Sequence, residues 1–188
     1  LADHCGDVYA CFLGAGSYRQ YIPAVVRQIA SRSEYMTAYT PYQPEVSQGT
    51  LQAHYEFQSL VCQLTGMEVA NAGMYDGSTA LAEAALMAAR ITGLSRIAVL
   101  DSVSPNYREV LQTYAQGPEL EIDVLSDGRV QIEQGTACVV AQQPNFFGYM
   151  EDMDAISKLA HSHGALLVAY VDPISLGMFT PPGDYDAD

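Results

Sequence analysis

A short run of polar residues before an expected helix is the first feature with chemical potential. Asp76-Gly77-Ser78-Thr79 stands directly before an alanine-rich segment from Ala80 to about Ile91, and alanine is the strongest helix former. Unpaired backbone N–H groups and the helix dipole at such an N-terminus attract anions such as phosphate. Asp76 or Ser78 could equally act as an ordinary helix cap. The sequence leaves both interpretations open.

A second carboxylate follows an expected strand. Asp172 comes directly after the apolar segment 166–171 and is followed by Pro173. In open parallel sheets, ligands bind outside the carboxyl ends of the strands. Asp172 could therefore pair with a protonated ring nitrogen of a ligand, or it could simply cap a turn before proline. These two interpretations are equally compatible with the residues.

The number of lysine residues limits the covalent chemistry that the chain can perform. Lys158 is the only lysine among the eight basic residues. Its neighbours follow a helical pattern that places it on an exposed face, whereas a Schiff-base lysine belongs in a desolvated crevice. We therefore expect Lys158 not to be catalytic. A mechanism that needs a lysine amine would take it from another chain.

Other motifs give little support for metal or dinucleotide binding. Gly14-Ala15-Gly16 resembles part of a dinucleotide fingerprint, but Arg19 stands where the third glycine is needed, so a tight turn is the plainer interpretation. His161 and His163 lie two residues apart in an expected helix and do not face each other. No Cys/His spacing typical of zinc is present. We predict no metal site.

An irregular segment at 33–49 stands apart from the rest. It is rich in tyrosine, proline and glutamine, and it shows neither helical nor alternating periodicity. Prolines fix backbone angles and remove N–H donors, so the segment is predicted to be an ordered loop. Its tyrosines each offer a flat ring and a hydroxyl group.

The elements that must position these residues alternate along the chain. We expect strands at 8–13, 68–71, 97–100, 120–125, 137–141 and 166–171, helices at 23–32, 50–64, 80–91, 105–115 and 152–163, a C-cap at Gly66 and a hairpin-like turn at 127–128. Short apolar strands that alternate with helices predict an α/β fold, a mainly parallel sheet with helices on both faces.

Composition and charge exclude several classes of function. The chain has 188 residues, 49% hydrophobic and 16% charged, which suits one domain with a sizeable core. A net charge of −14 disfavours nucleic-acid and anionic-membrane partners. No apolar run approaches the length of a membrane helix, and no signal peptide is visible. We expect the four cysteines to be reduced and the location to be cytoplasmic.

Several motifs together resemble the N-terminal part of glycine decarboxylase, the P-protein of the glycine cleavage system, in the form of subunit 1 of the two-subunit enzyme. The resemblance spans nearly the whole chain. The motifs are the segments 12–16, 21–23, 38–49, 71–83, 143–148, 172–177 and 181–183, of which 38–49 (AYTPYQPEVSQG) is the most specific.

This resemblance implies a type I pyridoxal-phosphate (aminotransferase-like) large domain, present here in part, and a role in glycine decarboxylation. It implies an N-terminal helix and a Tyr/Pro-rich interface loop at 1–50, followed by the partial large domain at 51–188. It also implies that pyridoxal 5'-phosphate is held by the lysine of a partner, subunit 2. Glycine would be the substrate, and the lipoylated H-protein would accept the aminomethyl group.

Site residues follow from the same resemblance. Tyr39, Tyr42 and Gln43 are candidates to reach the partner's active site. By fold analogy, Asp76, Gly77, Ser78 and Thr79 match the position that binds the cofactor phosphate, and Asp172 matches the carboxylate that faces the cofactor ring nitrogen. Both sites could be vestigial in a subunit that lacks the lysine.

Three alternatives stay open. The chain could be a scaffold that stabilises subunit 2 without reaching its site, or a stand-alone pyridoxal-phosphate enzyme whose lysine lies beyond residue 188. A nucleotide-dependent oxidoreductase is a more distant possibility. The resemblance further predicts an exposed sheet edge near Val69, where the usual neighbouring strands are absent.

Overall fold

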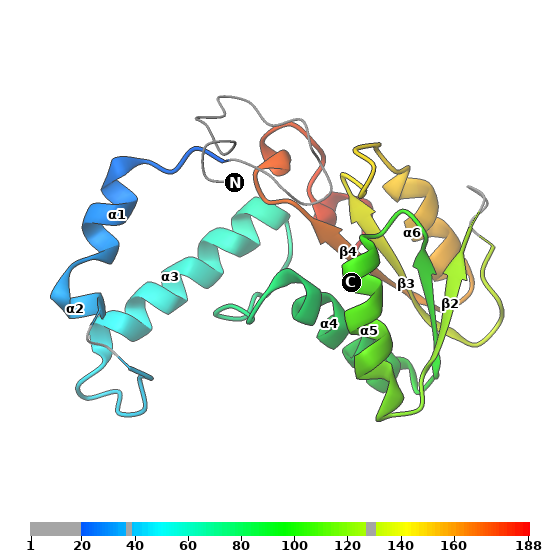
Figure 1. Cartoon of the computed structure of the whole chain (residues 1–188), viewed down its shortest axis with the longest axis horizontal. Helices are drawn as coiled ribbons and strands as arrows, with labels where there is room; N and C mark the ends of the chain where they lie inside the picture. The colour runs from blue at the N-terminus through cyan, green and yellow to red at the C-terminus, as the bar shows by residue number, and fades with distance from the viewer. Residues whose placement is uncertain (1–19, 37–38, 127–130) are drawn as a thin grey trace, which may run out of the picture.

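The computed structural model describes residues 20–36, 39–126 and 131–188. The expected strand at 8–13, the Gly14-Ala15-Gly16 turn and the turn at 127–128 lie outside the described residues. The described chain has two parts, an α/β body and an N-terminal arm that extends away from it (Figure 1). We define the arm as the described residues between 20 and 65.

The body is built around a four-stranded sheet in the order β2-β1-β3-β4. Each of the three strand pairs is parallel, with Ile97 opposite Ile122 in one pair and Val140 opposite Val168 in another. The strands are β1 (Arg96–Leu100), β2 (Glu121–Leu125), β3 (Thr136–Gln143) and β4 (Leu166–Val171). The parallel α/β prediction is therefore confirmed.

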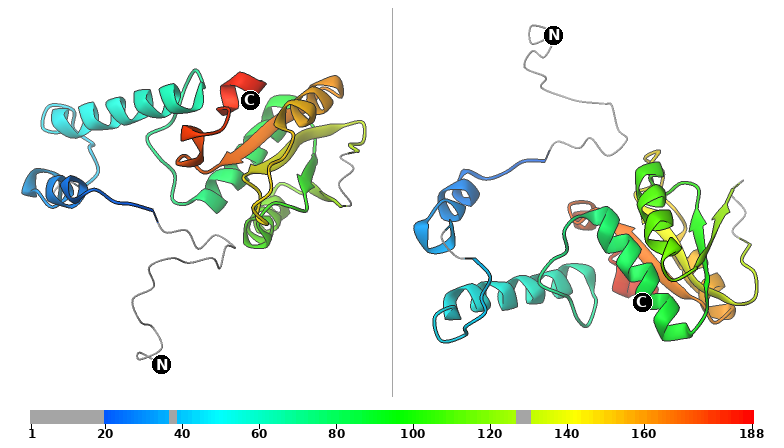
Figure 2. Two further views of the ribbon diagram at one scale, coloured as in Figure 1. Left: turned by 90° about the horizontal axis from the view of Figure 1, so that it is seen from above. Right: turned by 60° about the horizontal axis from the view of Figure 1, so that its bottom comes forward.

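Helices cover both faces of this sheet (Figures 1 and 2). On one face α4 (Gly77–Thr92) packs beside α5 (Pro105–Gln116), and on the other face α6 (Met153–Ser162) packs on β3 and β4. Small residues of α4 such as Ala82 and Ala85 are fully buried, which lets the helix approach the sheet closely. The core consists mainly of buried side chains from α4, α5 and α6 and from the strands β1, β3 and β4. The strands β1 and β3 carry buried apolar residues on both faces, as is typical of parallel sheets.

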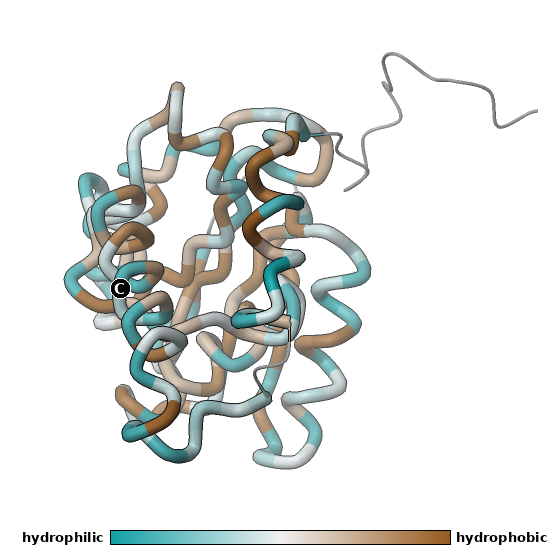
Figure 3. The backbone as a smooth tube through the Cα atoms, turned by 90° about the vertical axis from the view of Figure 1, so that its left-hand side faces the viewer, coloured by the Kyte–Doolittle hydropathy of each residue, from teal (hydrophilic) through white to brown (hydrophobic). Residues whose placement is uncertain are grey.

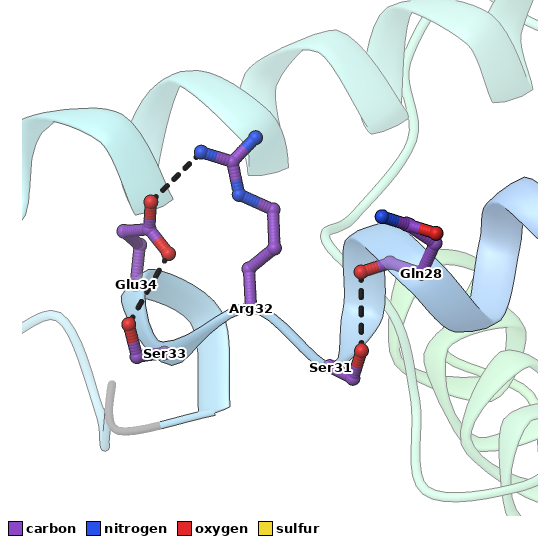
Figure 4. Close-up of polar contacts among 5 residues, drawn as sticks. All are labelled: Gln28, Ser31, Arg32, Ser33 and Glu34. Atoms are coloured by element: carbon purple, nitrogen blue, oxygen red, sulfur yellow. Dashed lines mark hydrogen bonds and ion pairs between the residues drawn. The ribbon is translucent and has the colours of Figure 1, made fainter.

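The arm contains three helices, α1 (Ala24–Ala30), α2 (Ser33–Met36) and α3 (Gln48–Thr65), and none of them has a buried residue. The turn between α1 and α2 is held by Ser31, whose hydroxyl donates to the Gln28 carbonyl, and by an Arg32–Glu34 ion pair of 2.8 Å (Figure 4). The helix α2 was not expected, because four residues are too few to show a helical period.

One close contact fixes the arm to the body. Gly66 ends α3 as the predicted C-cap, with a left-handed φ of 72° that glycine adopts without strain. The backbone of Gly183, in the short 3-10 helix Pro182–Tyr185, lies against the backbone of Gly66 so closely that a Cβ on Gly183 would overlap the Gly66 carbonyl. The end of α3 is therefore held against the C-terminal segment of the body.

One expected strand is not formed. The strand predicted at 68–71 is absent, and Val69 in that segment is 84% exposed. An extended segment becomes a strand only when a neighbour accepts its hydrogen bonds, and no described strand lies beside it. The helix α3 runs across residue 50, and the division of the chain into 1–50 and 51–188 remains a prediction.

Two kinds of feature are absent from the described residues. Among the helices of the described segments, none combines the length and apolarity needed to cross a membrane. Within the same segments, no group of three or more His, Cys, Asp or Glu side chains is placed to hold a metal ion.

Candidate functional site

The N-terminus of α4 is closed by its own capping residue. Asp76 Oδ1 accepts hydrogen bonds from the Thr79 backbone N–H (2.7 Å) and the Ser78 hydroxyl (2.7 Å), and Thr79 Oγ1 accepts in return from the Asp76 N–H (3.2 Å). This is a capping box. The Thr79 N–H and then the Ser78 hydroxyl lower the pKa of Asp76 below its ordinary value, so the carboxylate is ionised near neutral pH.

Gly77 has a packing role at the same position. A Cβ on Gly77 would lie 2.9 Å from both Cε2 and the hydroxyl oxygen of Tyr170 on β4. Tyr170 is fixed in turn by Tyr107 on α5, with 3.0 Å between the two hydroxyl oxygens and an edge-to-face ring contact at 4.9 Å. Only glycine lets α4 begin so close to this tyrosine pair.

Asp172 lies at the carboxyl end of β4, as predicted. Its Oδ1 accepts from the Ile174 backbone N–H at 3.0 Å and from the Gln20 side-chain amide at 3.4 Å, and its carbonyl accepts from the Ser175 hydroxyl at 2.6 Å. The carboxylate therefore caps the turn after the strand. It also contacts the first described residue of the arm.

Tyr39, Tyr42 and Gln43 lie at the far end of the arm. Tyr39 is 89% exposed and Tyr42 is 78% exposed. A shallow hollow of about 220 Å³ beside them is lined by Tyr39, residues of the loop and the first turn of α3. Within the chain this group lies well away from the start of α4 and from Asp172, so the structure does not unite the two predicted groups (Figure 1).

A polar network that we did not predict ties together the loops at the carboxyl edge of the sheet. Glu151 Oε1 accepts from the Ser102 hydroxyl (2.6 Å) and from the Asn145 amide (2.7 Å), and its backbone N–H donates to the Gln143 amide oxygen (2.9 Å). The polar run Gln142–Asn145 at a strand end was the available signal. The other members of the network, Ser102 in the loop after β1 and Glu151 just before α6, could not be identified from spacing.

These contacts decide how well this edge suits a pyridoxal-phosphate cofactor. A phosphate at the start of α4 would meet the ionised Asp76 carboxylate, which already uses the Thr79 N–H donor. The single lysine, Lys158, is exposed on α6, on the opposite face of the sheet from α4. The residues present do not fit a cofactor held by this chain alone.

Comparison with known proteins identifies the family. The family model for the glycine cleavage system P-protein matches residues 2–188. The chain belongs to the P-protein family. A relative from Desulforamulus reducens, described as "Probable glycine dehydrogenase (decarboxylating) subunit 1", is 52% identical, and the alignment covers 97% of this chain and 43% of that relative. A relative from Moorella thermoacetica with the same description is 55% identical, with 94% and 42% covered.

A solved structure agrees with this assignment. The P-protein chain of the crystal structure of glycine decarboxylase in inhibitor-bound form is 47% identical and superposes with a TM-score of 0.88, over 94% of this chain and 42% of that one. The described body is thus part of a type I pyridoxal-phosphate (aminotransferase-like) large domain, which confirms the predicted fold class. The chain spans less than half the length of the P-protein relatives that it matches.

Proposed function

We propose that this chain is part of subunit 1 of a heteromeric glycine decarboxylase and that it completes the active site of subunit 2. The observation that carries the proposal is the match to subunit 1 proteins over nearly the whole chain at 52–55% identity. Pyridoxal phosphate, when bound by subunit 2, would supply an electron sink for the carbanion formed as glycine loses carbon dioxide.

The exposed Lys158 and the Asp76 cap of α4 support different roles for the two subunits, in which subunit 2 holds the cofactor. This chain offers no desolvated amine for a Schiff base, and its capping carboxylate disfavours a bound phosphate dianion. We therefore favour the alternative in which the positions Asp76–Thr79 and Asp172 are vestigial and no longer bind the cofactor. The lipoylated H-protein remains the expected acceptor of the aminomethyl group.

The Tyr/Pro loop is our candidate for the contribution of this chain to the site of subunit 2. Tyr39 and Tyr42 present their hydroxyl groups to solvent at the end of the arm, and Gln43 beside them is exposed. In the heteromer these groups would donate hydrogen bonds to the cofactor phosphate or to the substrate region and would exclude water. The division into an interface segment at 1–50 and a partial large domain at 51–188 stays a prediction.

The location also remains an expectation. Cys62 and Cys138 are free thiols, and burial raises the pKa of the Cys138 thiol to about 12, which makes it inert. Reduced cysteines suit the cytoplasm, where we expect the enzyme to act. The thiols Cys5 and Cys11 lie outside the described residues.

Two measurements on the complex with subunit 2 test the proposal. Borohydride treatment with pyridoxal phosphate, followed by intact mass, should give a covalent adduct on subunit 2 and none on this chain. A stoichiometric adduct at Lys158 that blocks turnover would instead make this chain a cofactor-bearing enzyme.

Substitutions in the loop then separate catalysis from scaffolding. Tyr39→Phe and Tyr42→Phe should lower kcat of the reconstituted enzyme by roughly tenfold or more, because a hydrogen bond to the reacting complex is lost. Tyr149→Phe, on an exposed loop of the body, is the matched control and should leave kcat unchanged. Full activity in both loop variants would favour the scaffold alternative.

A further inference from the structure

Arg108 on α5 is a partly buried cation without an acidic partner. Its Nε atom is buried, and this N–H group donates to no acceptor among the described residues. The ion pairs that the described residues form do not include Arg108 either. A buried donor on a charged group that lacks an acceptor costs free energy, and in native proteins such a group calls for an explanation.

The other partly buried arginine of the described chain has two acidic partners. Arg96 pairs with Glu121 at 3.2 Å and with Glu133 at 2.8 Å. Carboxylates are also plentiful, since the chain has 22 acidic residues against eight basic ones. Hydrophilic positions are spread along the whole described chain and are not gathered in one segment (Figure 3). The lack of a carboxylate at Arg108 is therefore a property of this position and not of the composition.

The fold places Arg108 near the carboxyl edge of the sheet. The helix α5 begins after the short loop that follows β1, and in this loop the Ser104 N–H donates to the Gln142 side chain near the end of β3 at 2.9 Å. Side chains on a helix are tilted toward its N-terminus, so Arg108, close to the start of α5, leans toward this edge. In open parallel sheets, this is the edge where ligands bind.

The start of α5 has no negative charge of its own. Ser104 makes no side-chain capping bond, and the first turn of the helix contains no acidic residue. The N-terminus of a helix carries a partial positive charge, which disfavours a nearby cation and favours an anion. The neighbouring helix α4 meets this need with the Asp76 carboxylate. An anion beside Arg108 would be attracted both by the guanidinium group and by the start of α5.

We propose that Arg108 binds the carboxylate group of a small ligand at the carboxyl edge of this chain. A planar guanidinium group can donate two parallel hydrogen bonds to a carboxylate. A singly charged carboxylate is favoured over a phosphate dianion, because the chain already carries a net charge of −14 and the Asp76 carboxylate lies at the start of the neighbouring helix. The inference does not depend on the proposed function, because it concerns a site within this chain.

Chemical modification of arginine in the complete subunit 1, in complex with subunit 2, tests the site directly. Phenylglyoxal reacts with accessible guanidinium groups, and peptide mass analysis gives the rate at Arg108 and at Arg90, an exposed arginine on α4 that serves as the control. Acetate is the probe, and it replaces chloride at constant ionic strength. At an acetate concentration about ten times the dissociation constant, modification of Arg108 should slow roughly tenfold, and Arg90 should react at an unchanged rate.

Substitution of the same two arginines gives a second measurement on the complex. Arg108→Gln removes the charge at the site, and Arg90→Gln removes the same charge at an exposed position. Because Arg108 has no acidic partner in the chain, Arg108→Gln should not lower Tm in chloride. Replacing chloride with acetate should raise the Tm of the wild type and of Arg90→Gln more than that of Arg108→Gln.

Two results would overturn the inference. If Arg108 is modified at the same rate with and without acetate, its guanidinium group only extends into solvent and binds no carboxylate. If Arg108 is protected without acetate and Arg108→Gln lowers Tm, the carboxylate is an acidic side chain elsewhere in the protein and not a small ligand. Both results leave the proposed function standing, because that function is tested by the borohydride adduct on subunit 2.

Discussion

At the scale of single residues, two candidate site residues serve the fold in this structure. Asp76 caps α4 and Asp172 caps the turn after β4, each through a backbone N–H about 3 Å away. A carboxylate engaged in this way is fixed in position and satisfied. The capping interpretation, one of two that the spacing left open, therefore describes what the structure shows at both positions.

We expect the Asp76 cap to make stability depend on pH. The pKa of Asp76 is lowered below its ordinary value of 3.8, because the Thr79 N–H and the Ser78 hydroxyl favour the ionised form. Its contribution is fully present above the pKa of the unfolded chain and is lost as the pH falls through the lower folded value. Asp76→Ala should reduce Tm by roughly 2–4 °C near neutral pH.

The companion variant separates charge from hydrogen bonding. Asp76→Asn keeps an acceptor for the Thr79 N–H but cannot titrate. The difference in Tm between wild type and Asp76→Asn should therefore shrink below about pH 3.5. A difference that stays constant down to pH 2 would show that the ionised cap contributes nothing.

At the scale of elements, the contact between Gly66 and Gly183 fixes the position of the arm relative to the body. It joins the C-terminal end of α3 to the 3-10 helix at Pro182–Tyr185. These two elements are more than 100 residues apart in the chain. The contact is between two backbones, so it cannot be relieved by a change of side-chain rotamer. The body can hold α3 in this place only while Gly183 lacks a Cβ, whereas a Cβ on Gly66 would lie 3.3 Å from the Gly183 Cα, which is a tight contact but not an overlap.

We predict that Gly183→Ala separates these elements. The added methyl group would overlap the Gly66 carbonyl, and overpacking of this kind costs about 1–3 kcal/mol of unfolding free energy. Urea unfolding measures the loss. Gly177→Ala is the matched control, because no atom lies within 4 Å of a Cβ there, and it should be close to neutral. Equal stability of the two variants would contradict the contact.

At the scale of the whole molecule, acidic charge outweighs the ion pairs that could offset it. Against a net charge of −14, the described residues form the pairs Arg32–Glu34, Arg96–Glu121 and Arg96–Glu133, with His161–Asp188 added when the histidine is protonated. All of them are partly or largely exposed and contribute little. Repulsion among the remaining carboxylates therefore opposes the compact state.

Salt should accordingly stabilise the protein. Raising NaCl from about 0.01 M to about 0.15 M shortens the Debye length from about 30 Å to about 8 Å, so the repulsion is screened and Tm should rise. The control is the same titration close to pH 4.4, the isoelectric point that the composition implies, where the net charge vanishes and the salt effect should disappear. A Tm that falls with salt at pH 7 would contradict this account.

The sequence by itself determined the type and order of the elements in the body. The hydrophobic patterns that predict β1, α5, β3, α6 and β4 each lie within a short segment of sequence. The predicted bounds of these elements differ from the observed ones by at most two residues. It also determined the Gly66 cap and limited the cap of α4 to Asp76 or Ser78, because caps depend on a few neighbouring residues. The helix α4 itself begins at Gly77, three residues before the predicted start. The subunit 1 family was readable from local motifs for the same reason.

Only the tertiary structure decided what depends on distant parts of the chain. Residues 68–71 form no strand because a strand needs a neighbour. Glu151 binds Ser102 and Asn145 because the loop after β1 and the loop after β3 meet at one edge of the sheet. The apolar positions of α1 and α3, such as Val25 and Leu60, which are exposed among the described residues, illustrate the same dependence. Periodicity shows that a helix has an apolar face, but the packing of the whole chain decides whether that face is covered.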